Sequence, residues 1–141
     1  HLIRDESFHD HWGFTPVSAE TWQARYTNRS MHPELSLLSF LARDAHSKAP
    51  AAMVLTLSWD ADTEATGVRD AHLMMIGTMR DYRRRGLAGA LIGRALRAAE
   101  EQGYDRASLS VDSANPNGAF GVYEKAGFVP HNGWTRWALE R

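Results

Sequence analysis

Three arginines running into two glycines form the stretch of this sequence with the clearest chemical potential. The arginines at 83–85 lead directly into Gly86, Gly89 follows, and residues 86–103 have the periodicity of an amphipathic helix. A helix N-terminus carries unpaired amides and a partial positive charge, and glycines there let an anionic group approach the backbone. The stretch therefore predicts a phosphate or pyrophosphate site. The alternative is that the glycines only allow the helix to pack closely on a sheet.

The spacing of these glycines excludes two common phosphate-binding loops. A P-loop needs a lysine followed by serine or threonine, which this stretch lacks. Gly86, Gly89 and Gly93 do not fit the Gly-x-Gly-x-x-Gly pattern of dinucleotide-binding folds. Gly89 and Gly93 form a Gly-x-x-x-Gly pair, which in a charged helix indicates packing rather than association in a membrane.

Composition is typical of a soluble globular protein. The 141 residues predict one domain over 1–141, and the net charge of −1 argues against general affinity for nucleic acid or membranes. The absence of cysteine excludes disulfides, thiolate metal sites and a cysteine nucleophile. Neither the histidines near the N-terminus nor the acidic residues at 60–64 have metal-ligand spacing, so no metal is expected. The sequence has no long apolar run and no signal peptide, and we expect a cytoplasmic protein.

The elements that position the helix can be read from hydrophobic patterns. Short apolar runs at 34–44, 51–59 and 71–79 have the length and composition of strands. The polar segment between the last two predicts a hairpin loop in an antiparallel meander. Two helices are expected before the strands, the second with Ser18 as its N-cap.

The second half of the chain predicts a strand, a helix and a strand in succession. The helix over 86–103 is closed by Gly103, and residues 106–112 alternate as a strand, so 71–79 and 106–112 should lie parallel. A short helix ending at Ala126 follows, capped by Gly127. A strand from 128, a turn at 132–133 and a last strand complete the chain. The expected fold class is mixed α/β, with a mostly antiparallel sheet flanked by helices.

Two motifs in the chain resemble the GNAT superfamily of N-acetyltransferases. The first family signature, Arg/Gln-x-x-Gly-x-Gly/Ala, is matched at 83–88, and the second by Asn115 and the run YEKAGF at 123–128. The resemblance implies a GNAT-like fold in which strand 71–79 splays from strand 106–112 at a bulge near Ile76 to Thr78. GNAT domains open with a strand that residues 1–7 do not supply. Because the chain also begins without methionine, we expect a fragment that lacks this strand, such as the second domain of a tandem GNAT protein.

The resemblance also implies acetyl-CoA as the cosubstrate and assigns residues to it. Amides at the helix N-terminus would bind the pyrophosphate, and the main chain of strand 71–79 would bond the pantetheine arm and polarise the thioester carbonyl. Asn115 would bond the same arm, and Tyr123 would be catalytic, protonating the leaving thiolate. The cofactor-binding residues so implied are Ile76, Gly77, Thr78, Arg83, Arg84, Arg85, Gly86, Leu87, Ala88, Gly89 and Asn115.

The chemistry of thioester aminolysis agrees with a tyrosine acid. A phenol has a pKa of about 10 and a thiol about 8.5, so Tyr123 would hold its proton until the thiolate forms. The alternative for Tyr123 is an aromatic side chain that only packs in the core. The sequence leaves the base that deprotonates the amine open: Asp112 and His72, on neighbouring strands, are both candidates, and a structural role is open for each.

Two classes of function remain. The first is transfer of an acetyl group from acetyl-CoA to a primary amine, of a small molecule or of a protein, by direct attack on the thioester. The second is a non-catalytic acyl-CoA-binding or scaffolding half of a tandem GNAT protein. Tyr123, Asn115 and the glycine turn favour catalysis, because a scaffold does not need all three. An upstream domain or a homodimer is a possible partner, whereas nucleic acid and membranes are not expected.

Overall fold

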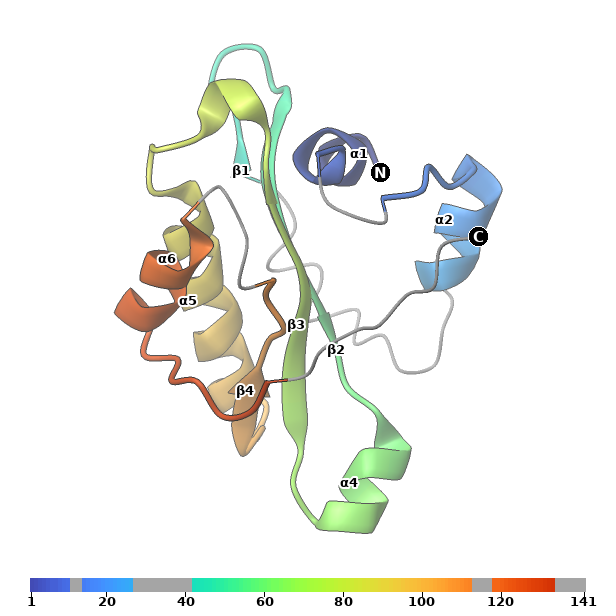
Figure 1. Ribbon diagram of the computed structural model, residues 1–141, viewed down its shortest axis with the longest axis vertical. Helices are drawn as coiled ribbons and strands as arrows, with labels where there is room; N and C mark the ends of the chain where they lie inside the picture. Colours follow the sequence, from blue (N-terminus) through green and yellow to red (C-terminus); the bar gives the residue numbers. More distant parts are fainter. Residues whose placement is uncertain (11–13, 27–41, 113–117, 134–141) are drawn as a thin grey trace, which may run out of the picture.

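The computed structural model describes residues 1–10, 14–26, 42–112 and 118–133. Its centre is a four-stranded sheet in the order β1-β2-β3-β4, with α5 and α6 on one face and α1 and α2 on the other (Figure 1). The strands are β1 (Ala42–Arg43), β2 (Pro50–Leu57), β3 (Asp70–Thr78) and β4 (Arg106–Ser108). The helices are α1 (Leu2–Phe8), α2 (Ala19–Tyr26), α4 (Asp60–Thr66), η1 (Arg80–Tyr82), α5 (Leu87–Glu101) and α6 (Ala119–Lys125). Among the described residues, no helix is both long and apolar enough to cross a membrane.

The sheet is mixed, as the sequence predicted. β2 pairs antiparallel with both β1 and β3, and β3 pairs parallel with β4 in the register Asp70↔Arg106 to His72↔Ser108. β2 is buried from Ala51 to Leu57 because helices cover both of its faces. The strands expected at 51–59 and 71–79 are therefore confirmed to within two residues at each end, whereas most of the run at 34–44 lies outside the described residues.

Two hydrophobic clusters lie on opposite faces of the sheet. On one face, Val54 and Leu73 pack against Leu91 and Ile92 of α5. On the other, Met53 and Leu55 pack against Ile3 of α1 and Trp22 of α2. Alanines at 71, 98 and 99 are all buried together, which lets α5 lie close to β3. Ser18 caps α2 by accepting a hydrogen bond from the Thr21 amide (3.1 Å), as predicted.

Three predicted elements are wrong. The hairpin loop after β2 contains helix α4, because its first turn carries Asp60 and Asp62, which favour a helix N-terminus, and Gly67 closes it in the left-handed conformation. Residues 128–133 form no strand, and the strand expected after them lies outside the described residues. The strand predicted over 106–112 is shorter than expected: it ends at Ser108, where its pairing with β3 ends.

Gly77 of β3 lets α1 pack directly on the sheet. A Cβ at this position would lie 3.1 Å from the Oγ of Ser7 and 3.2 Å from the Cγ2 of Ile3, both on α1. Gly93 of α5 has the opposite surroundings, since the nearest atom to its Cβ position is Arg97 Nη1 at 3.8 Å. A side chain would therefore meet the neighbouring helix at Gly77, whereas at Gly93 there is room for one.

We expect Gly77→Val to lower the free energy of unfolding by about 1–3 kcal/mol, because its methyl groups overpack the contact with α1. Gly93→Ala should raise the same quantity by about 0.5–1 kcal/mol through helix propensity. Urea unfolding followed by tryptophan fluorescence measures both. Equal stability of Gly77→Val and the parent chain would show that α1 does not pack as described.

Candidate functional site

The turn between β3 and α5 presents a helix N-terminus to solvent. Gly86, the residue before α5, has φ 75°, which favours glycine, and no described side chain caps the helix. The first bond within the helix runs from the Ala90 amide to the Gly86 carbonyl (3.0 Å), so the geometry leaves the amides of residues 87–89 to outside partners. Apart from chain neighbours and the helix's own backbone, no heavy atom of the described residues lies within 4 Å of the Cβ position at Gly86 or Gly89. This open, donor-rich end fits a phosphate or pyrophosphate.

The three arginines have different positions around this turn. Arg83 is half-buried and its Nε donates to the Thr78 carbonyl (3.2 Å), which ties the turn to the end of β3. Arg84 is exposed with φ 60°, a conformation that costs energy for a non-glycine residue. Arg85 is exposed, donates to the Asp81 carbonyl (2.9 Å) and lies 5.2 Å over the Tyr82 ring. The turn is thus held by its own side chains while positive charge faces solvent.

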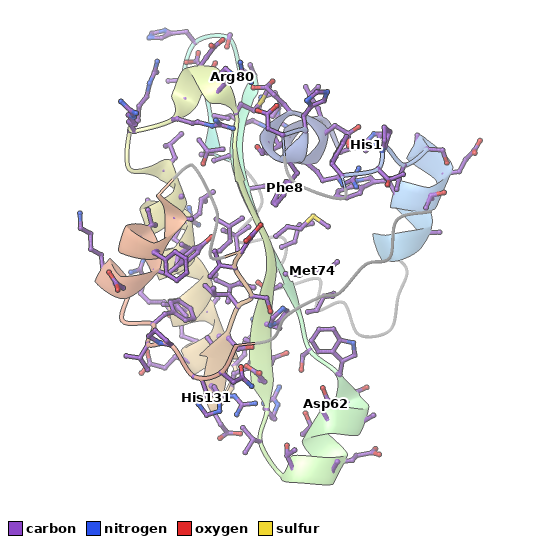
Figure 2. The ribbon with its side chains drawn as sticks, viewed as in Figure 1. His1, Phe8, Asp62, Met74, Arg80 and His131 are labelled. Carbon is purple, nitrogen blue, oxygen red and sulfur yellow. The ribbon has the colours of Figure 1, made fainter. Side chains whose placement is uncertain are left out.

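The turn is also fastened to α1. Glu6 accepts a hydrogen bond from the Arg80 amide (2.7 Å), and the Arg80 guanidinium lies 3.4 Å from the Asp10 carboxylate. Figure 2 shows Arg80 at the end of the molecule where α1 crosses β3. The helix on the other face of the sheet therefore supports the same turn that opens at α5.

The last part of β3 has one open edge. The Met79 amide bonds to the Ala51 carbonyl of β2 (2.9 Å), and in an antiparallel pair such bonds alternate along the strand. The main chain of Gly77 therefore faces β2, whereas that of Ile76 and Thr78 faces away from it. The bond from Arg83 to the Thr78 carbonyl agrees with this orientation. Ile76 and Thr78 thus offer backbone donors and acceptors at the edge, and Gly77 contributes the close approach of α1.

β3 and β4 separate after three paired residues. The last pair is His72 and Ser108, and we call this point the fork. Beyond His72, no described strand pairs with β3 on that side of the sheet. A bulge accompanies the separation, but it lies at Met74, where the register between β2 and β3 shifts, and not at Ile76 to Thr78 as predicted. Met74 lies midway along β3, between α1 and α4 (Figure 2). An extra residue there adds local twist, which turns β3 away from the line of β4.

Tyr123 lies on α6 and packs on the α5 face of the sheet. Its ring meets Phe128 edge-on at 6.5 Å between centroids, and Gly127 with φ 94° turns the chain back to make this contact. Burial raises the pKa of the Tyr123 phenol above its ordinary value, because the phenolate would lose solvation. Tyr123 is therefore kept protonated. Asn115, predicted to act beside it, lies outside the described residues.

A polar cluster at the fork was only partly predicted. His72 Nδ1 lies 2.9 Å from Ser108 Oγ, which donates to Asp70 Oδ2 (2.8 Å), and Arg106 lies 3.1 Å from the same oxygen. The indole of Trp59 lies against the imidazole, with ring centroids 5.6 Å apart. Sequence reasoning named His72 but not Asp70 or Ser108. The available signal was that 70 and 72, and 106 and 108, are polar pairs on single faces of strands predicted to be parallel.

The other candidate base has a different position. Asp112 is exposed and follows the end of β4 by four residues. No group of three or more His, Asp or Glu side chains in the described parts of the chain is arranged to hold a metal ion.

Comparison with known proteins gives a family match and a partial relative. Residues 3–128 match the Acetyltransferase (GNAT) family. Mycothiol acetyltransferase from Corynebacterium aurimucosum is 38% identical over 85 residues, which are 60% of this chain and 26% of that protein. The chain thus aligns with about a quarter of the length of this curated relative.

Solved structures share the fold. An aminoglycoside acetyltransferase from an uncultured soil metagenomic sample, in complex with sisomicin, superposes with a TM-score of 0.70 at 8% identity, over 99% of this chain and 84% of that one. A GCN5-related N-acetyltransferase from Sphaerobacter thermophilus has a TM-score of 0.67 at 25% identity, over 89% of this chain and 35% of that one.

We expect the phenol of Tyr123 to ionise above about pH 10, the ordinary value for tyrosine. Tyrosinate absorbance at 295 nm, titrated in the parent chain and in Tyr123→Phe, gives its midpoint as the difference between the two curves. Because a raised pKa keeps the folded state protonated while the unfolded state ionises, stability should fall as the pH rises above 10, and less so in Tyr123→Phe. If the midpoint of the difference between the two titration curves were at pH 10 or below, it would contradict the burial of this ring.

Proposed function

Because the chain belongs to the Acetyltransferase (GNAT) family, we propose that it transfers the acetyl group of acetyl-CoA to a primary amine. The observation that carries the proposal is the open N-terminus of α5, where Gly86 and Gly89 leave the backbone accessible beside exposed arginines. The alternative of packing glycines has less support, since a Cβ at either position would meet no atom of another described element.

Acetyl-CoA would be held at two places. Amides at residues 84–89 would bind its pyrophosphate. The positive charges of Arg84 and Arg85 would attract the same group, and Arg83 would hold the turn in place through its bond to the Thr78 carbonyl. The main-chain edge at Ile76 and Thr78, where Arg83 already occupies the Thr78 carbonyl, would bond the pantetheine arm in the position that a further strand would otherwise take. Of the residues first assigned to the cosubstrate, Gly77 would act indirectly. Its main chain faces β2, and its lack of a side chain lets α1 pack closely on the sheet.

Tyr123 would supply the proton for the leaving thiolate. Its raised pKa keeps the phenol neutral at physiological pH, so the phenol has a proton to donate. Because a thiol is a stronger acid than a phenol, this transfer is unfavourable by itself, and it is completed when the proton leaving the new amide nitrogen restores the phenol. An amide at the open edge of β3 would stabilise the oxyanion formed when the amine attacks. Asn115 would assist in binding the pantetheine arm.

The acceptor amine would lie on the face of the sheet opposite α5, where α1 and α2 pack. The names of the relatives support acyl transfer to an amine, but they do not identify which amine this chain would acetylate. A panel of sisomicin, an amino sugar, free lysine and a peptide with an N-terminal alanine covers small-molecule and protein amines. Thiol release from acetyl-CoA, measured with each, tests the proposal. Binding of CoA with no amine-dependent thiol release would instead support a non-catalytic CoA-binding domain.

Gly89→Glu and Gly93→Glu form a matched pair for the binding of CoA. We expect Gly89→Glu to weaken CoA binding by at least a hundredfold, because a carboxylate would occupy the helix mouth and repel the pyrophosphate. Gly93→Glu adds the same charge one turn later, beside Arg97, and should leave affinity within a few-fold. Both variants should remain folded, since neither Cβ meets an obstacle. Isothermal titration with CoA measures the difference, and equal affinities would contradict the proposed pyrophosphate site.

Tyr123→Phe separates catalysis from binding. The variant keeps the ring and its contact with Phe128, so CoA affinity should stay within about twofold of the parent. Its kcat should fall by about 10²–10⁴-fold, the usual contribution of a general acid. Steady-state thiol release with the best amine of the panel measures this. Unchanged turnover would exclude Tyr123 as the acid.

A further inference from the structure

We propose that His72 is the general base for this acetyl transfer, held in its basic tautomer by Ser108 and Asp70. The inference rests on the proposed function and decides between the two bases that the sequence leaves open. It is carried by the hydrogen-bond chain at the fork and by the side of the sheet on which that chain lies.

The chain of hydrogen bonds fixes the tautomer of His72. Ser108 donates its single hydroxyl proton to Asp70 Oδ2 (2.8 Å), because a carboxylate oxygen can only accept. The Ser108 oxygen must then accept at the 2.9 Å contact with His72 Nδ1, so Nδ1 carries the proton. The Nε2 atom of the neutral imidazole is therefore left as an acceptor, the form that a general base requires. Asp70 is fixed in turn by Arg106 at 3.1 Å.

The position of His72 suits the removal of a proton from an incoming amine. Its strand neighbours Ala71 and Leu73 are buried against α5, so by the alternation of a strand His72 faces the opposite side of the sheet. Tyr123 packs on the α5 side. The proposed base and the proposed acid thus lie on opposite faces of the sheet. Ile76 is four positions after His72, about 13 Å along the strand, a distance that the imidazole, the amine and one water molecule can fill.

The charge state of His72 agrees with this role. Burial lowers its pKa below the ordinary value, and the nearby carboxylate of Asp70 opposes this in part. Among the described residues, Asp70 and its partner Arg106 are the charged groups in the hydrogen-bond chain, and the ring of Trp59 covers the imidazole without charge. Asp112, the other candidate, is exposed beyond the end of β4.

The protons in the reaction then balance. The amine arrives as R–NH3⁺ and gives one proton to His72 Nε2, which later releases it to solvent. The neutral amine attacks the carbonyl carbon, forming the C–N bond, and collapse of the adduct breaks the C–S bond. The thiolate takes the phenolic proton of Tyr123, and the second proton leaving nitrogen restores that phenol. The sum is one amide, one thiol and one proton released.

The activity test is the pH dependence of kcat/KM with the best amine of the panel. The parent chain should lose activity as the pH falls through a value below about 6.5, as His72 becomes protonated. His72→Gln should lower kcat/KM by about 10²–10³-fold and abolish this acidic limb, with CoA affinity within twofold as evidence of folding. Asp70→Asn should move the limb to lower pH, because it removes the charge that raises the pKa of His72. His131→Gln, which removes an exposed histidine on the α5–α6 side of the sheet, is the matched control and should behave as the parent (Figure 2).

Ser108 is tested as a positioning residue. Ser108→Ala should lower kcat with little change in KM for the amine, and Ser108→Thr, which keeps the hydroxyl, should restore most of it. Nitrogen-15 spectra of histidine-labelled protein report the tautomer without any acceptor: we expect the Nδ1–H form for His72, and a mixture in Ser108→Ala.

The outcomes separate this inference from the proposed function. The role of His72 would be overturned if His72→Gln kept both the value of kcat/KM and its fall at acidic pH, while Asp112→Asn lost them. Acetyl transfer itself would stand in that case. An Nε2–H tautomer in the parent chain would overturn it as well. Failure of the parent chain to release thiol with every amine would reject the acetyl transfer itself, and this inference with it.

Discussion

The one-sided pairing of β3 is the constraint on which the rest of the site depends. β3 is bonded to β2 along its length but to β4 only at residues 70–72. Backbone donors and acceptors must be satisfied, so an edge strand that leaves its neighbour is a ready template for an extended ligand. Arg83 already uses one such group, the Thr78 carbonyl. The bulge at Met74 helps to produce this edge, because it turns β3 while its pairing with β2 continues.

Close packing on both faces keeps the edge in place. On one side, small residues at 71, 98 and 99 draw α5 onto the sheet, which brings its N-terminus to the end of β3. On the other, the absence of a side chain at Gly77 seats α1, and Glu6 of α1 bonds to the Arg80 amide at the start of the turn. The turn that would bind the pyrophosphate and the helix beside the acceptor side are therefore mechanically connected through one strand.

Burial has opposite effects on the pKa values of the proposed acid and the proposed base, and each effect favours the neutral form of its group. Removing a group from water disfavours its charged form. The pKa of Tyr123 is raised and that of His72 is lowered, so each is neutral near pH 7, the phenol able to donate and the imidazole able to accept. Two half-buried side chains on opposite faces of the sheet are thus neutral, as the proposed acid and the proposed base each require.

The sequence by itself determined the local elements and the motif positions. The apolar stripe and closing glycine of α5, the Ser18 cap, the two long strands and their mixed arrangement all follow from short-range patterns, and each is confirmed. The helix at 60–66 was missed although its acidic first turn and Gly67 were visible in the sequence. Tertiary structure alone decided the bulge at Met74, the early end of β4 and the chain from Asp70 through Ser108 to His72. These depend on which residues face each other across strands 36 positions apart, and that register is set by the packing of whole elements, which no local pattern encodes.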